Sequence, residues 1–216
     1  MAVIELIFPK FKPDQASIDE LEREWPIISP KLTNPNPGLL SAFRGWILTE
    51  NGRNVREENR AFLLFEWNTV ESFHAFFASE QFAGFVVAIK HLVTEPSKLQ
   101  LCEVSLSPKN AASASSIEIL RVTVPSAENA DGALKTWEEI SQKAKEKYGN
   151  KVAITYGRSQ NLEEVVVAGI IGWSGSEDCI LATGGGVLGD SFESLKTFGE
   201  LSHITVGIGA MELPPL

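Results

Sequence analysis

The sequence predicts an α+β fold in which one β-α-β-β-α-β unit occurs twice in tandem. The prediction rests on short segments of the first half that recur, in the same order, in the second half. The pairs are Val3–Ile7 with Ser116–Leu120, Ala42–Gly45 with Ile154–Gly157, and an apolar run that ends at Trp67 with one that ends at Trp173. Self-similarity of this kind indicates two copies of one structural unit.

Length and composition agree with two small folded domains. The chain has 216 residues, 44% of them hydrophobic, and a formal net charge of −9. Two domains of about 100 residues each are a usual division of such a length. An acidic chain without a basic cluster binds nucleic acid and anionic membranes poorly, so neither is expected as a partner.

Several features predict a cytoplasmic protein. No apolar run reaches about 18 residues, so no transmembrane helix is predicted. The first residues lack the basic region and the small-residue cleavage site of a secretory signal. Cys102 and Cys179 each stand alone in an apolar stretch, and both are expected to be buried thiols of a reducing compartment.

The first repeat is predicted to span residues 1–105. It begins with a short apolar strand over residues 3–8. A helix follows, opened by Pro13 and Asp14 and limited by Pro26, in which Ser17 and Glu20 have capping-box spacing. The remaining elements are a loop over 30–38, a hairpin of strands 40–48 and 60–67, a helix over 69–92 broken near Ser79, and a strand over 99–104.

The second repeat is predicted to span residues 116–216, after a linker over 106–115 that is rich in Ser and Ala. The expected elements are strands over 116–124, 151–158, 165–173 and 203–211, a helix over 129–148, and a helical region that ends near Phe198. Their order is that of the split βαβ, or ferredoxin-like, motif.

The hairpin strands of both repeats are apolar on both faces, as in Phe62–Phe65 and Val165–Ala168. A sheet of this kind needs cover on both sides. Its own helices cover one face, and the sheet of the other repeat is the simplest cover for the second face. We therefore predict two ferredoxin-like repeats packed sheet to sheet as a barrel-like pseudo-dimer, with the helices outside.

The segment from Trp67 to Phe82 carries the most specific pattern in the chain, WNTVESFHAFFASEQF. It resembles the pattern W-x-[ST]-x-E-[AS]-F-x-x-[WF]-x-x-[ST]-E-x-[FY] of the dimeric α/β-barrel superfamily, and within it of the antibiotic-biosynthesis-monooxygenase-like proteins. The pattern encodes a strand end, a helix cap at Thr69, an inner aromatic face and a helix restart at Ser79. Together with the repeat, the resemblance implies a single-chain dimeric α/β-barrel, similar to fused proteins of fungal secondary-metabolite pathways.

The resemblance also implies an enzyme without a cofactor. Members of the superfamily oxygenate polycyclic phenols or cyclise polyketides, and others cleave haem. Haem-cleaving members place their iron ligand where this sequence has Val86, and His91 lies more than one helical turn further on, so no haem is expected. The implied substrate is a hydrophobic polyketide- or terpenoid-derived molecule, and the reaction is oxygenation, cyclisation or isomerisation. The alternative is a non-catalytic small-molecule binding or stress-response protein of the same fold.

The position of a pocket stays open between the repeats. The first repeat has the phenylalanines of the pattern, and the second lacks them after Trp173. We expect the pocket in the aromatic first repeat, with a cavity opened by the depleted second repeat as the alternative. Gly184, Gly186 and Gly189 spell GxGxxG, but too little chain follows for a dinucleotide-binding fold. No cofactor and no metal are expected, and a further homodimer is left open.

The candidate catalytic residues are His74, Glu5 and Arg44. His74 lies at the margin of the aromatic helix face and suits proton transfer near neutral pH; the alternative is a surface histidine. Glu5, repeated as Glu118, is an acid among apolar strand residues, which is costly unless it is paired. Each acid is expected either to form an ion pair or to be an acid of raised pKa in a pocket. The expected partners of the two acids are Arg44, Arg60, Arg121, Tyr156 and Arg158.

The candidate substrate-binding residues are Trp25, Trp46, Glu66, Phe73, Phe76 and Phe77. The three phenylalanines are predicted to form the inner face of their helix. Trp46 follows Arg44 on a strand, where it would line a flat aromatic pocket. Glu66 has the same two interpretations as Glu5, and each tryptophan has a structural role in the core as its alternative.

Overall fold

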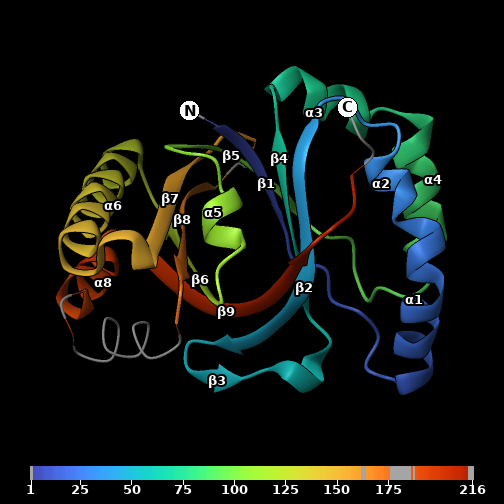
Figure 1. The fold of residues 1–216 in the computed structure, drawn as a ribbon, viewed down its shortest axis with the longest axis horizontal. Coiled ribbons are helices and arrows are strands. Elements are labelled where there is room, and N and C mark those ends of the chain that lie inside the picture. Colours follow the sequence, from blue (N-terminus) through green and yellow to red (C-terminus); the bar gives the residue numbers. More distant parts are fainter. Residues whose placement is uncertain (1, 162–163, 176–185, 187, 214–216) are drawn as a thin grey trace.

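A computed structural model describes residues 2–161, 164–175, 186 and 188–213 of the chain. An antiparallel barrel forms the centre of the molecule (Figure 1), with the strand order β2-β4-β1-β5-β7-β8-β6-β9. β9 pairs again with β2, which closes the barrel, and the short β3 extends the sheet beside β2. The strands are β1 (Ala2–Ile7), β2 (Leu39–Glu50), β3 (Arg53–Asn54), β4 (Ala61–Trp67), β5 (Leu99–Val104), β6 (Ser116–Val124), β7 (Val152–Ser159), β8 (Val165–Trp173) and β9 (Glu200–Ala210).

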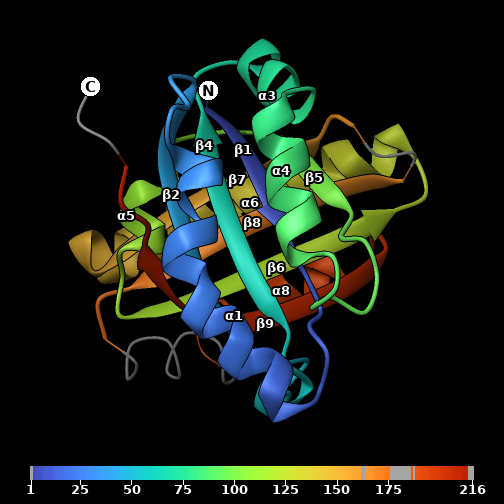
Figure 2. The same ribbon diagram turned by 90° about the vertical axis from the view of Figure 1, so that its right-hand side faces the viewer.

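Helices lie on two opposite sides of the barrel (Figure 1). They are α1 (Gln15–Ile28), α2 (Pro30–Thr33), α3 (Val70–Phe77), α4 (Glu80–Ile89), α5 (Lys109–Ala112), α6 (Ala127–Tyr148) and α8 (Gly189–Leu195), with short 3₁₀ turns η1 (Arg56–Glu58) and η2 (Gly149–Lys151). α6 and α8 belong to the second repeat, and α1 to α4 belong to the first. Figure 2 looks onto α1 and α4, which lie across the strands of the first repeat.

The sheet order confirms the predicted fold. Each repeat has its strands in the ferredoxin-like order, β2-β4-β1-β5 in the first and β7-β8-β6-β9 in the second. The repeats are joined by pairing of β5 with β7 and of β2 with β9. Because successive strand residues point to opposite faces, one set of side chains fills the barrel and the other set meets the helices. Ile4, Phe62, Leu64, Ile119 and Ile170 are among the residues that fill the barrel.

The predicted break in the helix after Trp67 is confirmed. The side chain of Thr69 caps α3 by accepting a hydrogen bond from the backbone N–H of Ser72, and the side chain of Ser79 caps α4 in the same way from Phe82. α3 and α4 are bent by 62° at this break. Within the described residues no single helix has the length and apolar composition to cross a membrane, and α3 and α4 reach these values only when taken together across the bend.

Two predicted details of the first helix are wrong. The N-cap is Asp14, whose Oδ1 accepts the backbone N–H of Ser17 at 2.9 Å, so Ser17 lies inside the first turn and does not begin a capping box. The helix does not end at Pro26 but continues to Ile28 and is followed directly by α2. A proline has no N–H and so leaves one helical hydrogen bond unmade. The helix nevertheless continues past Pro26, where the N–H of Ser29 donates to the carbonyl of Trp25 at 2.8 Å.

The predicted linker contains a short helix, α5. Its Ala111 and Ala112 are buried against the residues that fill the barrel, so this segment covers one end of the barrel. Cys102 is buried inside the barrel as expected. Cys179 and Gly184 lie outside the described residues, so the structure describes the GxGxxG segment only in part.

Candidate functional site

A cavity of about 770 Å³ lies between the sheet and the helices of the first repeat. Its floor is the helix-facing side of β1 and β4, where Glu5, Ile7, Leu63 and Phe65 are found. Its walls come from α1, α3 and α4, and residues of the segment from Lys90 to Leu99, together with Asn161, form its rim. The cavity therefore lies in the aromatic repeat, under the helices of the pattern that follows Trp67.

Phenylalanines from α3 and α4 make the wall aromatic. Phe73 and Phe76 are buried, and their rings lie 5.9 and 5.5 Å from the ring of Trp67. Phe77, predicted for the same inner face, also lines the cavity, but it is 47% exposed and so is not buried as the other two are. Phe77 is the last residue of α3, where the chain bends, and its ring meets Phe82 of α4 at 4.8 Å.

Glu5 is the polar group of the cavity floor. Its residue surface is 3% exposed, and its Oε2 accepts a hydrogen bond of 3.1 Å from the indole Nε1 of Trp67. Burial raises the pKa of the Glu5 carboxyl to about 8, although the bond from Trp67 acts in the opposite direction. The second oxygen, Oε1, has no hydrogen-bond partner among the described residues. At neutral pH Glu5 is therefore mainly a neutral carboxylic acid in an apolar cavity.

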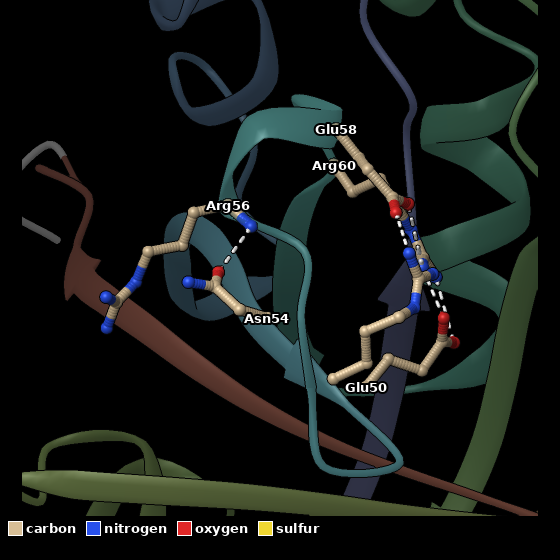
Figure 3. Close-up of polar contacts among 6 residues, drawn as sticks. Glu50, Asn54, Arg56, Glu58 and Arg60 are labelled. Carbon is tan, nitrogen blue, oxygen red and sulfur yellow. Dashed lines mark hydrogen bonds and ion pairs between the residues drawn. The ribbon is translucent and has the colours of Figure 1, made fainter.

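The predicted pairing of Glu5 with Arg60 is wrong, because the two side chains lie on opposite faces of the sheet. Glu5 faces the helices, whereas the guanidinium of Arg60 lies between Glu50 and Glu58 (Figure 3). Arg60 directly precedes β4, and its Nη2 donates to Glu50 Oε1 at 3.1 Å. The hydrogen bond from Arg60 lowers the pKa of Glu50. Arg60 is thus paired away from the cavity and does not reach Glu5.

Arg44 does line the cavity, but it forms no ion pair with Glu5. Its guanidinium carbon lies 4.0 Å from the ring centroid of Trp25, and its Nη2 donates to Glu22 Oε1 at 2.8 Å. The side chain of Arg44 is 13% exposed. Trp25 and Arg44 thus form one end of the cavity, with a positive charge held against an aromatic face.

His74 lies on the exposed side of α3, at the edge of the cavity. It is among the lining residues, and its ring lies 5.1 Å from the ring of Phe73. The position leaves His74 in contact with both solvent and cavity. Glu5 lies on the floor and His74 at the edge, so the structure places the two predicted acid–base residues at different depths.

Two predicted substrate contacts lie outside this cavity. Trp46 is not among the lining residues, and it packs edge-on against Phe11 at 6.0 Å in a cluster beneath α1 that borders the cavity. Glu66 alternates with Phe65 and Trp67, which meet the helices, so it points to the other face of β4, where it accepts a hydrogen bond of 2.8 Å from Ser41. Strand alternation therefore removes Glu66 from the site.

The second repeat contains the same acid in a different environment. Glu118 is 1% exposed, and its Oε2 accepts a hydrogen bond of 2.7 Å from Trp173 Nε1. Its Oε1 lies 2.8 Å from the Nε2 of His203. The expected arginine and tyrosine partners of Glu118 are thus replaced by an indole and an imidazole. Both oxygens of Glu118 are used, whereas Glu5 uses one.

The strand registers explain this difference. The helix-facing row of the first repeat runs Arg44, Leu63, Ile7, Leu99 across β2, β4, β1 and β5. The corresponding row of the second repeat runs Tyr156, Gly169, Leu120, His203 across β7, β8, β6 and β9. Leu99 therefore occupies the position of His203, which removes the second partner of the acid in the first repeat.

A tryptophan fills the space in the second repeat that is open in the first. Trp137 and Trp25 have the same place in α6 and α1, counted from the N-caps Ser126 and Asp14. Trp137 is fully buried on Gly169, where a Cβ would lie 2.2 Å from its ring, and it stacks on Tyr156. In the first repeat Leu63 stands in place of Gly169, so Trp25 has no equivalent flat surface to occupy.

The sequence analysis missed the two acid–indole pairs and the role of His203. The recurrence of both Glu and Trp at equivalent places was visible, but each was interpreted separately. Each acid meets its indole across a pair of neighbouring strands, β1 with β4 and β6 with β8, so the contact depends on strand register. The contact of His203 depends on the register of β6 and β9, which the sequence pattern does not specify.

The fold and the helix-covered cavity together define a single-chain dimeric α/β-barrel. No protein-family model and no curated protein matches this sequence. Solved structures of the same fold include a presumed monooxygenase from Lactobacillus acidophilus NCFM, with a TM-score of 0.63, 10% identity and 99% of each chain covered.

Two further structures are similar over nearly the whole chain. A presumed monooxygenase from Fusobacterium nucleatum subsp. nucleatum ATCC 25586 has a TM-score of 0.66 and 10% identity, with 100% of this chain and 96% of that chain covered. An anthrone oxidase-like protein has a TM-score of 0.65 and 12% identity, with 97% and 93% covered. These likenesses confirm the expected fold, a barrel built from two repeats in one chain.

Proposed function

We propose that the cavity of the first repeat is the active site of a cofactor-independent enzyme of secondary metabolism. Its substrate would be a hydrophobic polyketide- or terpenoid-derived small molecule, and its reaction an oxygenation, cyclisation or isomerisation that begins with proton transfer. The observation that supports this most is the position of Glu5 on the floor of an aromatic cavity. It is a buried acid, and one of its oxygens has no partner among the residues that the structure describes. Large apolar cavities with few convergent polar groups are typical of small-molecule sites.

The lining residues have distinct roles in this proposal. Glu5 takes or gives the proton, and Trp67 holds its carboxyl in place. Arg44 stabilises negative charge that develops on a substrate oxygen. Trp25, Phe73, Phe76 and Phe77 hold the rings of the substrate, which places the reacting atom next to Glu5. His74 exchanges the proton with solvent at the edge of the cavity.

Oxygenation is supported by the names of the structural relatives, two presumed monooxygenases and an anthrone oxidase-like protein. In this version the carboxylate form of Glu5 removes a proton from an acidic CH₂ group of the substrate. The carbanion is then oxidised by O₂. One oxygen atom becomes the product carbonyl, the other leaves as water, and the CH₂ group loses both hydrogens. Cyclisation and isomerisation would use the same proton transfer without O₂.

The proposal is tested by incubating the protein with lipophilic polycyclic phenols and ketones in an oxygen-electrode cell. Oxygen uptake matched by product formation supports the oxygenase. Product formation without uptake supports a cyclase or isomerase. Glu5→Gln should lower the rate at least about 100-fold, as expected for a lost acid–base group, while the surface control Leu106→Ser keeps it. Binding without any turnover would leave the non-catalytic alternative. The proposal includes a cytoplasmic location, which the sparse cysteines support.

A further inference from the structure

The second repeat supplies an internal template for what binds in the first. In the second repeat an imidazole, His203, contacts Glu118 Oε1 at 2.8 Å, and the ring of Phe192 lies 6.4 Å from it. In the first repeat the matching oxygen, Glu5 Oε1, has no partner among the described residues. The space beside it is lined by Leu99, at the position of His203, and by the aromatic wall of the cavity.

Comparison of the two repeats therefore shows which part of the interaction around the acid they share and which part occurs only in the second repeat. The acid and its indole donor are kept in both repeats, at 3.1 Å and 2.7 Å. The flat, hydrogen-bonding ring on the second oxygen is present as a protein side chain in one repeat and is missing in the other. Only 3% of the Glu5 surface is exposed, so an oxygen of its carboxyl without a partner among the described residues makes fewer hydrogen bonds than it would in water. A bound molecule with a suitable polar group would restore them.

We infer that Glu5 Oε1 binds the hydroxyl or ring N–H of a planar aromatic ligand, and that Leu99 determines this specificity by leaving the oxygen unoccupied. The ligand class is phenols and azole-type heteroaromatics whose rings fit among the phenylalanines. A neutral carboxylic acid suits such ligands because it both donates and accepts a hydrogen bond. The inference names the ligand class of the proposed active site and rests on that proposal for its biological meaning, but binding alone tests it.

The experiment compares 2-naphthol with 2-methylnaphthalene, which has the same ring system and no hydroxyl. Binding is measured by fluorescence titration at pH 7 with the full-length protein. The wild type should bind 2-naphthol about tenfold more tightly, since a buried hydrogen bond that is lost leaves a polar group unpaired. Leu99→His should abolish this preference, because the new imidazole takes Oε1 as His203 does in the second repeat. Leu99→Met, of similar size and without a donor, should keep it.

Two further measurements separate this role from a general effect on folding. Circular dichroism establishes that each variant is folded, and Glu5→Leu, which removes the carboxyl, should also abolish the preference. The indole N–H resonance of Trp67 should shift when 2-naphthol binds to the Leu99→Met variant and not to Leu99→His. Equal binding of the two probes by the wild type, or an unchanged preference in folded Leu99→His, would overturn the inference. Selective binding without turnover would support the inference while contradicting the proposed catalysis.

Discussion

Trp137 lies against Gly169 so closely that a Cβ built on this glycine would be 2.2 Å from the indole ring. The contact fills the second repeat where the first repeat has its cavity. The same helix position is occupied by Trp25 in the first repeat, where the facing strand residue is Leu63. The space between helix and sheet is thus filled in the second repeat, where the strand has Gly169, and open in the first repeat, where the strand has Leu63.

This contact predicts that Gly169→Ala is strongly destabilising. The added methyl group has no space unless Trp137 or β8 moves, and overpacking of a core typically costs about 1–3 kcal/mol. Urea unfolding followed by tryptophan fluorescence measures the change. Gly209→Ala is the matched control, because a Cβ at residue 209 would have no atom within 4 Å. A loss of less than about 0.5 kcal/mol for Gly169→Ala would show that the indole does not depend on this close approach.

The order of the elements was predictable because it depends on local patterns. The caps at Thr69 and Ser79 and the apolar strand runs are encoded within a few residues, and the repeat supplied the topology. The partners of the acids were not predictable in this way. Glu5 meets Trp67, and Glu118 meets His203, across strands whose register is set by the closed barrel. The wrong placement of Glu66 was avoidable, since alternation along β4 assigns it to the opposite face from Trp67.

Glu5 should make the stability of the protein depend on pH. Burial raises the pKa of its carboxyl to about 8 in the folded protein, from an ordinary value of 4.5. Between these two pH values the folded state keeps a proton that the unfolded state has lost, so this contribution to stability falls as the pH rises and becomes constant above pH 8. The total loss from Glu5 is on the order of a few kcal/mol.

The test is Glu5→Gln, which keeps an oxygen for the hydrogen bond from Trp67 and cannot ionise. The difference in unfolding free energy between variant and wild type should grow in favour of the variant from pH 5 to pH 8, by at least about 2 kcal/mol. Chemical denaturation at several pH values measures it. A difference that stays constant across this range would mean that Glu5 titrates near its ordinary pKa.

The same pKa predicts how the reaction rate depends on pH. The direction of that dependence shows whether Glu5 acts as a base or as an acid. If the carboxylate removes a proton from the substrate, the rate should rise up to about pH 8 and then level off. If the neutral acid donates a proton to a substrate carbonyl, the rate should fall through the same pH. Initial rates in a buffer series of constant ionic strength measure the profile, with His74→Gln as the companion variant. A profile that loses its pH dependence in His74→Gln would show that it does not report Glu5.

Cys102 should be unreactive in the folded protein. Burial raises the pKa of its thiol to about 12, so almost no thiolate is present at neutral pH, and the thiolate is the reactive form. The side chain also lies among the residues that fill the barrel. In a Cys179→Ser variant, an aromatic disulfide reagent should label less than about one tenth of the protein at pH 7.5 and label it fully in denaturant. Rapid labelling of the folded variant would show that the barrel opens on the timescale of the reaction, and the rate should then increase in the destabilised Gly169→Ala background.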